Sequence, residues 1–509
     1  MTGKLVRTVF FALLAASHAA LAQFDAARFE SLVEEGMRDW RVPGLALAVV
    51  DDGEIVYENG WGVTVPGGAP VDERTLFANA STTKAMVAAG LLVLADEERL
   101  DLDDPVIDYL PELHFGPGID SRAVTIRDLL AHRTGLARTD FWTFAQRMPL
   151  DEQIERLRLV APAAGPRERL LYQNTMYELA GLVIDRVAGK PWYEFLDERL
   201  WTPIGMHDTV GLRGHIPAGS ARAFPHDEVD GRIVPIAYDL EPDREDAAGS
   251  AWSTAHDMAL WARFLLAGGV TADGRRLLSE DAIADMFRPA QLASAEDFYP
   301  TVELTRPQWM SYALGWFQQD FDGRKIDFHT GSLDGLVAIL GLDRAAGRAI
   351  VVLQNLDGSE LRHALMWEFL DTREPAARRD WLADVRELYR ERRREDEREW
   401  QEAAAGRLAG AGTTLPLDAY YGRYASELLG TIEFAAARGG DVVVPARPSH
   451  DGPVLRTSMY EYEAAHWHVD TFTVDYMSWS YPQFARFLID PAGAVEAIEV
   501  FGEVFERVE

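Results

Sequence analysis

Two side chains that could perform acyl-transfer chemistry stand three positions apart in the segment Ser81-Thr82-Thr83-Lys84. Residues i and i+3 share one face of a helix, so the lysine amine can stand beside the serine hydroxyl. At a helix start, free backbone N–H groups and the dipole favour an oxyanion and disfavour an ammonium. A neutral Lys84 could then take the serine proton, which requires its pKa to fall by several units from about 10.4. The alternative is an N-cap serine with a chance lysine, because this motif alone is weak.

Lysine is used sparingly in this chain, which adds weight to Lys84. Only four of the 50 basic residues are lysines, namely Lys4, Lys84, Lys190 and Lys325. Arginine cannot release its proton at any useful pH, whereas a desolvated lysine can, so lysine at position 84 is suited to act as a base. Lys190 and Lys325 occur without a motif, so this observation is suggestive only.

A second candidate element is Tyr172-Gln173-Asn174, just before a helix expected to start near Tyr177. A tyrosine near a cationic lysine can be held close to the phenolate form and can shuttle protons. The asparagine faces the same side of an extended segment and could bond both a substrate amide and Lys84. The alternative is a core tyrosine with a turn asparagine, which is the commoner origin of an isolated Tyr-x-Asn.

A third element, His329-Thr330-Gly331, ends a predicted strand and runs into Ser332. A glycine here would let a substrate lie along the strand edge without a side-chain clash. The backbone N–H of Ser332 is then a candidate oxyanion donor beside that of Ser81. Taken alone, His329 is more simply a surface histidine on a strand. In this order with the other two segments, it indicates a substrate-binding strand.

The elements that must position these residues predict a domain with two lobes. Two strands, Gly44–Val50 and Glu54–Trp61, flank a hairpin turn, and four more lie between Tyr312 and Leu353. An apolar helix at Asn79–Leu94 carries Ser81 and Lys84, and residues 125–275 have mostly helical spacing. Strands at both ends with helices between them predict one shared sheet and a helical lobe, with the site where they meet.

The C-terminal part has a different pattern. From Ala376 to Arg407 the chain reads as a charged helix, best explained as a solvated connection with pairs between its own side chains. After a linker at Gly410–Pro416, short strand-like runs with turn signals predict a small β-barrel or sandwich. These runs are Tyr420–Tyr424, Gly430–Phe434, Val442–Val444, Thr471–Val474, Phe484–Ile489, Ala497–Phe501 and Phe505–Val508. The predicted units are therefore 1–22, 23–375, 376–414 and 415–509.

The N-terminus indicates export. Residues 1–22 have a basic start, a short apolar run and the ending Ala20-Leu21-Ala22, which is typical of a cleavable signal peptide. The apolar run is far shorter than the roughly 20 residues that a spanning helix needs. We expect cleavage after Ala22 and a periplasmic or secreted protein without stable membrane insertion.

Composition limits the chemistry and the partners. The length of 509 residues exceeds one core of ordinary size, and the hydrophobic share of 48% is normal for a globular protein. The absence of cysteine excludes disulfides, thiolate metal sites and a cysteine nucleophile. The net charge of −32 would repel nucleic acid and anionic lipid. His466 and His468 lack a third ligand, and we interpret Trp192, Trp201, Trp252, Trp261 and Trp316 as core residues.

Together these segments resemble the penicillin-recognising serine hydrolases, particularly the class C β-lactamase-like branch with its esterases, D-aminopeptidases and related amidases. The resemblance covers most of residues 24–370. Beyond the three motifs it rests on Gly44–Val49, Ile126–Leu136, Pro203–Met206, Ala248–Asp257 and Leu314–Trp316. The C-terminal segment resembles the lipocalin-like barrel that some members append, through Tyr421-Gly422-Arg423-Tyr424 and Phe505-Glu506-Arg507.

The resemblance implies an α/β (α+β) fold, in which an antiparallel sheet flanked by helices joins an all-helical lobe and a small β-barrel follows. It implies an acyl-enzyme mechanism with no cofactor and no metal. Ser81 would be the nucleophile, Lys84 the acylation base and Tyr172 the group that activates water for deacylation. The substrate would be oriented or bound by Asn174, His329, Thr330, Gly331 and Ser332.

One departure from the family pattern bears on the substrate. The β-lactamases and transpeptidases usually carry lysine where this chain has His329, which is largely neutral at pH 7 and cannot hold a substrate carboxylate by fixed charge. We therefore expect small esters, amides or short peptides with D-amino acids as substrates. A β-lactamase or DD-peptidase is the alternative, and a catalytically silent binding protein is another. The sequence leaves open whether the protein forms a homo-oligomer through its C-terminal domain.

Overall fold

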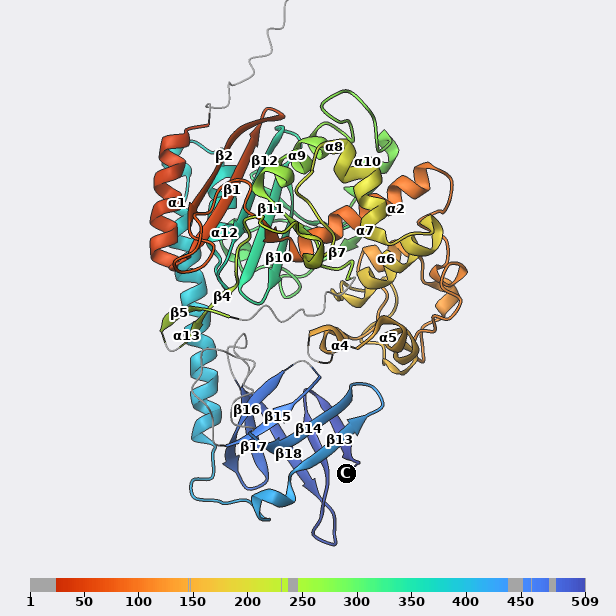
Figure 1. Ribbon diagram of the computed structural model, residues 1–509, viewed down its shortest axis with the longest axis vertical. Coiled ribbons are helices and arrows are strands. Elements are labelled where there is room, and N and C mark those ends of the chain that lie inside the picture. The colour runs from red at the N-terminus through yellow and green to blue at the C-terminus, as the bar shows by residue number, and fades with distance from the viewer. Residues whose placement is uncertain are drawn as a thin grey trace, which may run out of the picture.

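The computed structural model describes residues 24–144, 146, 148–229, 231–236, 246–437, 452–458, 460–475 and 482–508. The predicted signal peptide at 1–22 and the strand predicted at 442–444 lie outside these residues. A mixed domain of helices and strands lies above a small β domain, and the long helix α13 (Trp381–Ala405) runs from one to the other (Figure 1).

An eight-stranded antiparallel sheet forms the centre of the first domain, in the order β2-β1-β12-β11-β10-β9-β8-β7. Because β1 pairs with β12, the two ends of the domain's sequence share one sheet, as the strand pattern predicted. The strands are β1 (Gly44–Asp51), β2 (Glu54–Gly62), β7 (Gln291–Leu292), β8 (Met310–Tyr312), β9 (Phe317–Phe321), β10 (Arg324–Leu333), β11 (Leu336–Asp343) and β12 (Arg348–Gln354).

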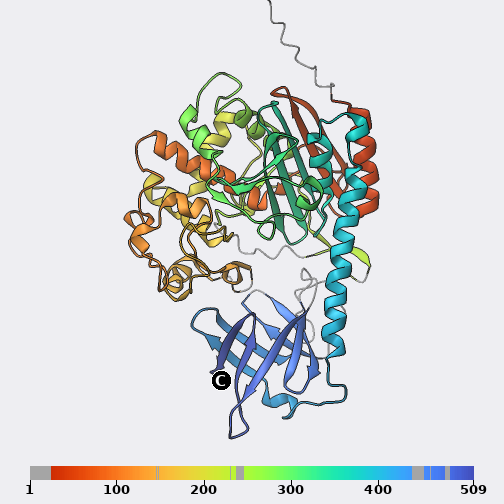
Figure 2. The ribbon, with the colours of Figure 1, turned by 180° about the vertical axis from the view of Figure 1, so that it is seen from behind.

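Both faces of this sheet are covered, so β1, β11 and β12 are apolar along most of their length. Successive side chains of a strand point to opposite faces. Along β1, Leu45 and Leu47 join the core beneath α1 and α12, whereas Ala46 and Ala48 join the core beneath α9 and the helical lobe. Figure 2 shows α1 and the upper part of α13 side by side along the sheet.

Helices dominate the section between β2 and β7, as predicted. Within this domain α1, α10, α11 and α12 were not predicted from the sequence. Two pairs of short strands, β3 (Phe77–Ala78) with β6 (Trp252–Ser253) and β4 (His226–Val229) with β5 (Arg232–Pro235), interrupt the helices. The helices are α1 (Ala26–Trp40), α2 (Thr83–Asp96), α3 (Ile126–Leu130), α4 (Asp140–Phe144), α5 (Leu150–Arg156), α6 (Thr175–Ala188), α7 (Trp192–Leu196), α8 (Thr202–Ile204), α9 (Ala255–Leu266), α10 (Glu280–Met286), α11 (Val302–Thr305) and α12 (Leu361–Leu370).

The C-terminal domain is a closed barrel of eight strands in sequence order, which decides between the barrel and the sandwich. Aromatic side chains fill it, including the buried Phe434, Phe472 and Phe487. The sequence pattern missed β15 and β16. The strands are β13 (Gly422–Ser426), β14 (Gly430–Ala436), β15 (Pro453–Arg456), β16 (Glu461–His468), β17 (Thr471–Asp475), β18 (Gln483–Ile489), β19 (Val495–Val500) and β20 (Glu503–Arg507).

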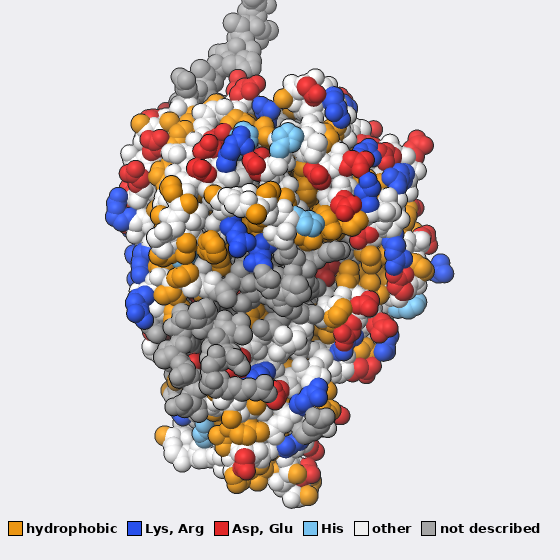
Figure 3. All heavy atoms as spheres, in the orientation of Figure 1, with side chains coloured by type: hydrophobic (Ala, Val, Ile, Leu, Met, Phe, Trp, Pro, Cys, Tyr) orange, Lys and Arg blue, Asp and Glu red, His pale blue; other side chains and the backbone are white. Residues whose placement is uncertain are grey.

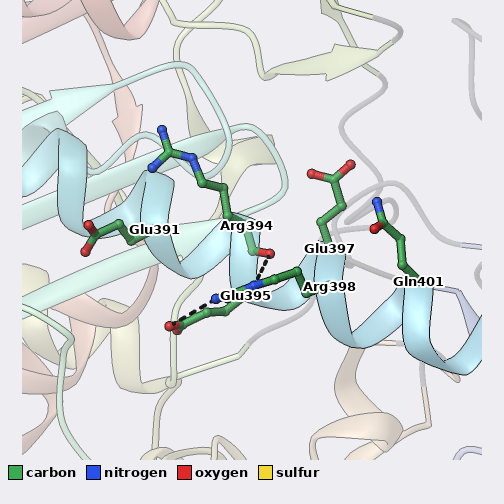
Figure 4. A pocket seen from close by; sticks show the side chains of 6 residues that line it. All are labelled: Glu391, Arg394, Glu395, Glu397, Arg398 and Gln401. Atoms are coloured by element: carbon green, nitrogen blue, oxygen red, sulfur yellow. Dashed lines mark hydrogen bonds and ion pairs between the residues drawn. The ribbon is translucent and has the colours of Figure 1, made fainter.

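Only the second half of helix α13 fits the prediction of a solvated connection. Its first half buries Trp381, Leu382, Val385 and Leu388, three of which belong to the core that α1 and α12 cover. Figure 4 shows charged side chains around a shallow hollow on its exposed middle section, where Arg398 donates to the Arg394 carbonyl oxygen and pairs with Glu395.

On the face drawn in Figure 3, acidic and basic side chains are interspersed. Among the helices that the structure describes, none has the length and apolar character needed to cross a membrane. The five tryptophans expected in the core are all buried.

Candidate active site

Ser81 lies in a short 3-10 turn, η1 (Ala80–Thr82), that leads directly into α2. The residue before it, Ala80, has a left-handed φ of 46°, an uncommon conformation for a side chain with a Cβ. All the residues of α2 from Thr83 to Leu94 are buried, whereas Ser81 is partly exposed. The serine hydroxyl therefore lies at the border between the core and solvent. The buried helix that follows it fixes its position.

Lys84 is fully buried and its amine has three polar neighbours. Nζ lies 3.0 Å from Ser81 Oγ, 2.7 Å from Asn174 Oδ1 and 2.8 Å from the Ala248 carbonyl oxygen. The asparagine and carbonyl oxygens only accept hydrogen bonds, so an amine that has lost one proton must give them its two remaining hydrogens. Its lone pair then faces Ser81 Oγ. This arrangement suits removal of the serine proton.

Burial lowers the pKa of Lys84 to about 8, although the negative charges of Asp246, Asp140 and Glu178 partly oppose this effect. A lowered pKa is what a general-base role for Lys84 requires. With a pKa near 8, about a tenth of the lysine is neutral at pH 7. The aromatic ring of Tyr172, with its centroid 5.1 Å from Nζ, completes the enclosure.

Tyr172 lies beside Ser81 as well as Lys84, and the nearby Ser81 hydroxyl acts to lower the pKa of the tyrosine. It is partly exposed, and its ring packs against His132 at a centroid distance of 4.2 Å. Burial raises its pKa well above the usual value of a tyrosine. This direction runs against the expectation that Tyr172 is held close to the phenolate form, and the negative charge of Asp140 acts in the same sense as burial.

Asn174 precedes α6 and connects Lys84 to an acid that the sequence analysis did not single out. Its Oδ1 accepts from Lys84, while its backbone N–H and its Nδ2 both donate to Asp140 Oδ1, at 3.0 and 3.2 Å. These bonds fix which end of the amide faces the lysine. The segment around Asp140 carries no spacing signal, because its partners lie 34 residues away in the sequence.

His329 is nearly fully buried, so the interpretation as a surface histidine is wrong. Its Nδ1 donates to the Thr330 carbonyl oxygen at 2.6 Å, and its Nε2 accepts from the Tyr312 hydroxyl at 3.0 Å. Burial lowers its pKa to about 3, so the ring is neutral at pH 7, as expected. No charged group therefore stands at the position where the family usually has lysine.

The rest of this strand lies directly against the serine. A Cβ on Gly331 would stand 2.2 Å from the Asn79 carbonyl oxygen and 3.1 Å from the Ser81 backbone nitrogen, so only glycine fits there. Thr330 is buried and bonds the Tyr299 hydroxyl, whereas Ser332 is exposed. The pairing of β10 with β9 ends at Phe328, so the segment 329–333 pairs on its β11 side alone.

The structure thus brings Ser81, Lys84, Tyr172 and Asn174 together at one point and places Gly331 and Ser332 beside them. No cluster of three or more His, Cys, Asp or Glu side chains suitable for a metal occurs in the described part of the chain. His466 and His468 are separated by a register shift in β16 and bond backbone groups of Val469 and Leu408.

The chain is similar to known proteins in sequence and in fold. The Beta-lactamase family matches residues 29–371. The unguisins hydrolase ungD' of Aspergillus campestris is 28% identical over 390 residues, which are 71% of this chain and 68% of that protein. The D-stereospecific amidohydrolase from Streptomyces sp. is 25% identical with a TM-score of 0.55, over 69% of this chain and 100% of that chain.

The barrel is included in a further match. The octameric penicillin-binding protein homologue from Pyrococcus abyssi aligns with 95% of this chain and 100% of its own, with a TM-score of 0.60 and 21% identity. This likeness shows a shared fold. Since the family match spans well over half of the chain and includes the serine, lysine, tyrosine and glycine described above, the chain belongs to the Beta-lactamase family.

Proposed function

We propose that this protein is a serine hydrolase that forms an acyl-enzyme on Ser81 and cleaves small esters, amides or short peptides containing D-amino acids. The observation that carries the proposal is the 3.0 Å contact between Lys84 Nζ and Ser81 Oγ, with the amine desolvated and its other hydrogens directed to fixed acceptors. A binding protein without catalysis has no use for a buried lysine held in this way.

Acylation follows from these contacts. Neutral Lys84 takes the hydroxyl proton as Ser81 Oγ attacks the substrate carbonyl carbon. The backbone N–H groups of Ser81 and Ser332 stabilise the negative charge that develops on the carbonyl oxygen. When the intermediate collapses, the bond to the leaving group breaks, and the proton now on Lys84 passes to that group through the Tyr172 hydroxyl.

Deacylation uses the same groups in the reverse direction. A water molecule attacks the acyl carbon, and one of its protons passes through the Tyr172 hydroxyl to neutral Lys84. The bond from the acyl carbon to Ser81 Oγ then breaks, and the oxygen recovers a proton from the lysine. Tyr172 acts here as a neutral relay, which agrees with the direction of its pKa.

Two features bear on the substrate: one disfavours a substrate carboxylate that would need a fixed positive charge, and the other limits substrate size. The first is the buried, neutral His329. The second is the C-terminal barrel, which contacts segments on both sides of the site. Phe501 of the barrel packs against Phe141, directly after Asp140, at 4.8 Å. The Tyr460 hydroxyl donates to Asp334 Oδ2, just after Ser332, at 3.3 Å. We propose that the barrel limits the length of substrate that reaches Ser81.

The relatives support a hydrolase in general terms and an amidase more specifically. The D-stereospecific amidohydrolase and the unguisins hydrolase carry those activities in their names. Export to the periplasm or medium is proposed on the signal-peptide pattern of residues 1–22. Assembly into an oligomer is a second proposal, supported by the octameric state named for the Pyrococcus abyssi homologue.

A fluorophosphonate probe tests the nucleophile. We expect the wild-type protein to be labelled and Ser81→Ala to remain unlabelled. Equal labelling of both proteins would show that a residue other than Ser81 is the nucleophile. No labelling of either protein would favour the catalytically silent alternative.

Three chromogenic substrates then separate the substrate classes. We expect turnover of p-nitrophenyl acetate and D-alanine p-nitroanilide and slow turnover of nitrocefin. Fast nitrocefin hydrolysis would instead support the β-lactamase alternative and would overturn the argument from His329.

A further inference from the structure

A buried arginine holds the strand segment that lies beside Ser81. Arg362, the second residue of α12, is 4% exposed and lies on the opposite face of the sheet from Ser81. Its Nη1 donates to the Gly331 carbonyl oxygen at 2.5 Å, to Ser332 Oγ at 3.0 Å and to the Ala338 carbonyl oxygen at 3.3 Å. One guanidinium therefore contacts both residues of the Gly331–Ser332 peptide.

The orientation of that peptide follows from this contact. In a trans peptide the C=O and the N–H point in opposite directions. The Gly331 carbonyl is directed to Arg362 on the β11 side, so the Ser332 N–H is directed to the other edge of β10, where pairing with β9 has ended. Alternation along the strand agrees, because the Cβ position of Gly331 faces the Ser81 turn while the Ser332 side chain faces Arg362.

The arginine itself is fixed by charge. Its Nε and Nη2 donate to the two carboxylate oxygens of Glu360, each at 3.2 Å, in the forked geometry that arginine forms with carboxylates. Glu360 also bonds His363 Nδ1 at 2.5 Å. The nearby Arg362 guanidinium, with His363, lowers the pKa of Glu360 to about 2, so the pair stays charged over the working pH range.

We propose that Arg362 is a positioning residue, which locks the Gly331–Ser332 peptide so that the Ser332 N–H is held ready for the oxyanion of the reaction. This inference rests on the proposed acyl-transfer function. Without the arginine the peptide could rotate, since no ladder partner holds it on the β9 side, and the donor would be lost from the site. Arg362 touches no substrate and acts through Ser332.

The test uses two variants, the single variant Arg362→Met and a double variant that carries both Glu360→Gln and Arg362→Met. The double variant avoids leaving a buried carboxylate without its arginine. For both we expect kcat on p-nitrophenyl acetate to fall about 10²-fold with KM within about twofold, the size of effect seen when one oxyanion donor is lost. The preference for an oxygen ester over the matching thionoester, whose sulfur is a weaker acceptor, should fall roughly tenfold. Arg362→Lys, which can still donate to the carbonyl, should recover part of both losses.

Arg324→Met is the matched control. Arg324 lies on the same strand, pairs with Asp343 and donates to the Leu370 carbonyl oxygen at 2.8 Å, but it lies seven residues before Gly331. We expect it to lower the melting temperature and leave the oxygen-to-sulfur preference unchanged. If the Arg362 variants only lower the melting temperature in the same way, Arg362 is structural and the inference is wrong.

A readout without catalysis separates this inference from the proposed function. Hydrogen exchange measured by mass spectrometry on the peptide containing Ser332 should be faster in Arg362→Met than in wild type and Arg324→Met. Unchanged exchange with unchanged kcat overturns the inference while leaving the hydrolase intact. If wild type is inactive and unlabelled, the proposed function fails and the oxyanion role fails with it, even where exchange is faster.

Discussion

The two sides of Ser81 contribute to the site in different ways. The helical side supplies titratable side chains, Lys84 and Tyr172, and an amide that orients them. The sheet side supplies backbone groups, with Gly331 against the serine and the neutral His329 two residues before it on the same strand. Chemistry on the helical side should therefore depend on pH and on side-chain identity, whereas the sheet side should depend on the geometry of a few peptide groups.

The largest effect is expected from a change of base on the helical side. Lys84→Arg keeps the positive charge but cannot release a proton, so the rate of acylation should fall about 10³-fold. The rate of labelling by a fluorophosphonate measures this step. Lys190→Arg, a change at an exposed lysine paired with Glu198, is the control and should leave the rate unchanged. Substantial activity in Lys84→Arg would show that another group is the base.

A backbone change on the sheet side comes next. In Gly331→Ala the new Cβ would collide with the Asn79 carbonyl oxygen and press on the Ser81 turn. We expect kcat to fall about 10²-fold, because one misplaced backbone donor costs that much, together with a lower melting temperature. Gly412→Ala, where no atom lies within 4 Å of the added Cβ, should match wild type. Normal kcat in Gly331→Ala would mean that β10 does not constrain the serine.

The pH profile distinguishes the two sides directly. Lys84 must be neutral to act as a base, so kcat/KM should rise with pH and level off above about 8. His329, with its pKa lowered to about 3, should add no limb between pH 5 and 9. A profile that is flat through pH 8 would contradict the assignment of the base.

A smaller shift of that limb is expected from Asp140→Asn. The asparagine keeps an oxygen that accepts from Asn174 but removes a negative charge that stabilises the Lys84 ammonium. The pKa of Lys84 then falls, so the limb should move to lower pH and the rate at pH 7 should rise by up to a few-fold. Glu402→Gln, at an exposed acid near the end of α13, is the control. A shift to higher pH would refute the electrostatic explanation.

The smallest effect concerns the barrel. Phe501→Ala removes the ring that packs against Phe141, so longer peptide substrates should gain about threefold relative to D-alanine p-nitroanilide, an effect of the size of one aromatic contact. Phe484→Ala, whose ring contacts Trp400 of α13, is the matched change on the barrel. An unchanged ratio in Phe501→Ala would separate the barrel from substrate choice.

The same contrast explains how much could be predicted from the sequence. The spacing of Ser81 and Lys84 is local, so helix geometry alone placed them together, and the hairpin at Asp51–Gly53 follows from turn residues whose φ is positive at Asp52 and Gly53. The shared sheet and the barrel followed from the order of strand patterns. The domain boundaries stay predictions.

What the sequence did not reveal depends on contacts between distant segments. Asp140 and Arg362 carry no motif, and their partners Asn174 and Gly331 lie 34 and 31 residues away. The direction of the Tyr172 pKa depends on how much water the fold removes, which no spacing encodes. For His329 taken alone, a surface position was the simpler interpretation, and the histidine is buried because Tyr312 and Phe317 enclose it.

The burial of Lys84 also has a practical consequence for chemical modification. The other lysines of the described residues, Lys190 and Lys325, keep side-chain exposures of 36% and 33%. Within the described part of the chain, amine-directed dyes or surface coupling should therefore attach at those two positions without touching the buried amine of Lys84.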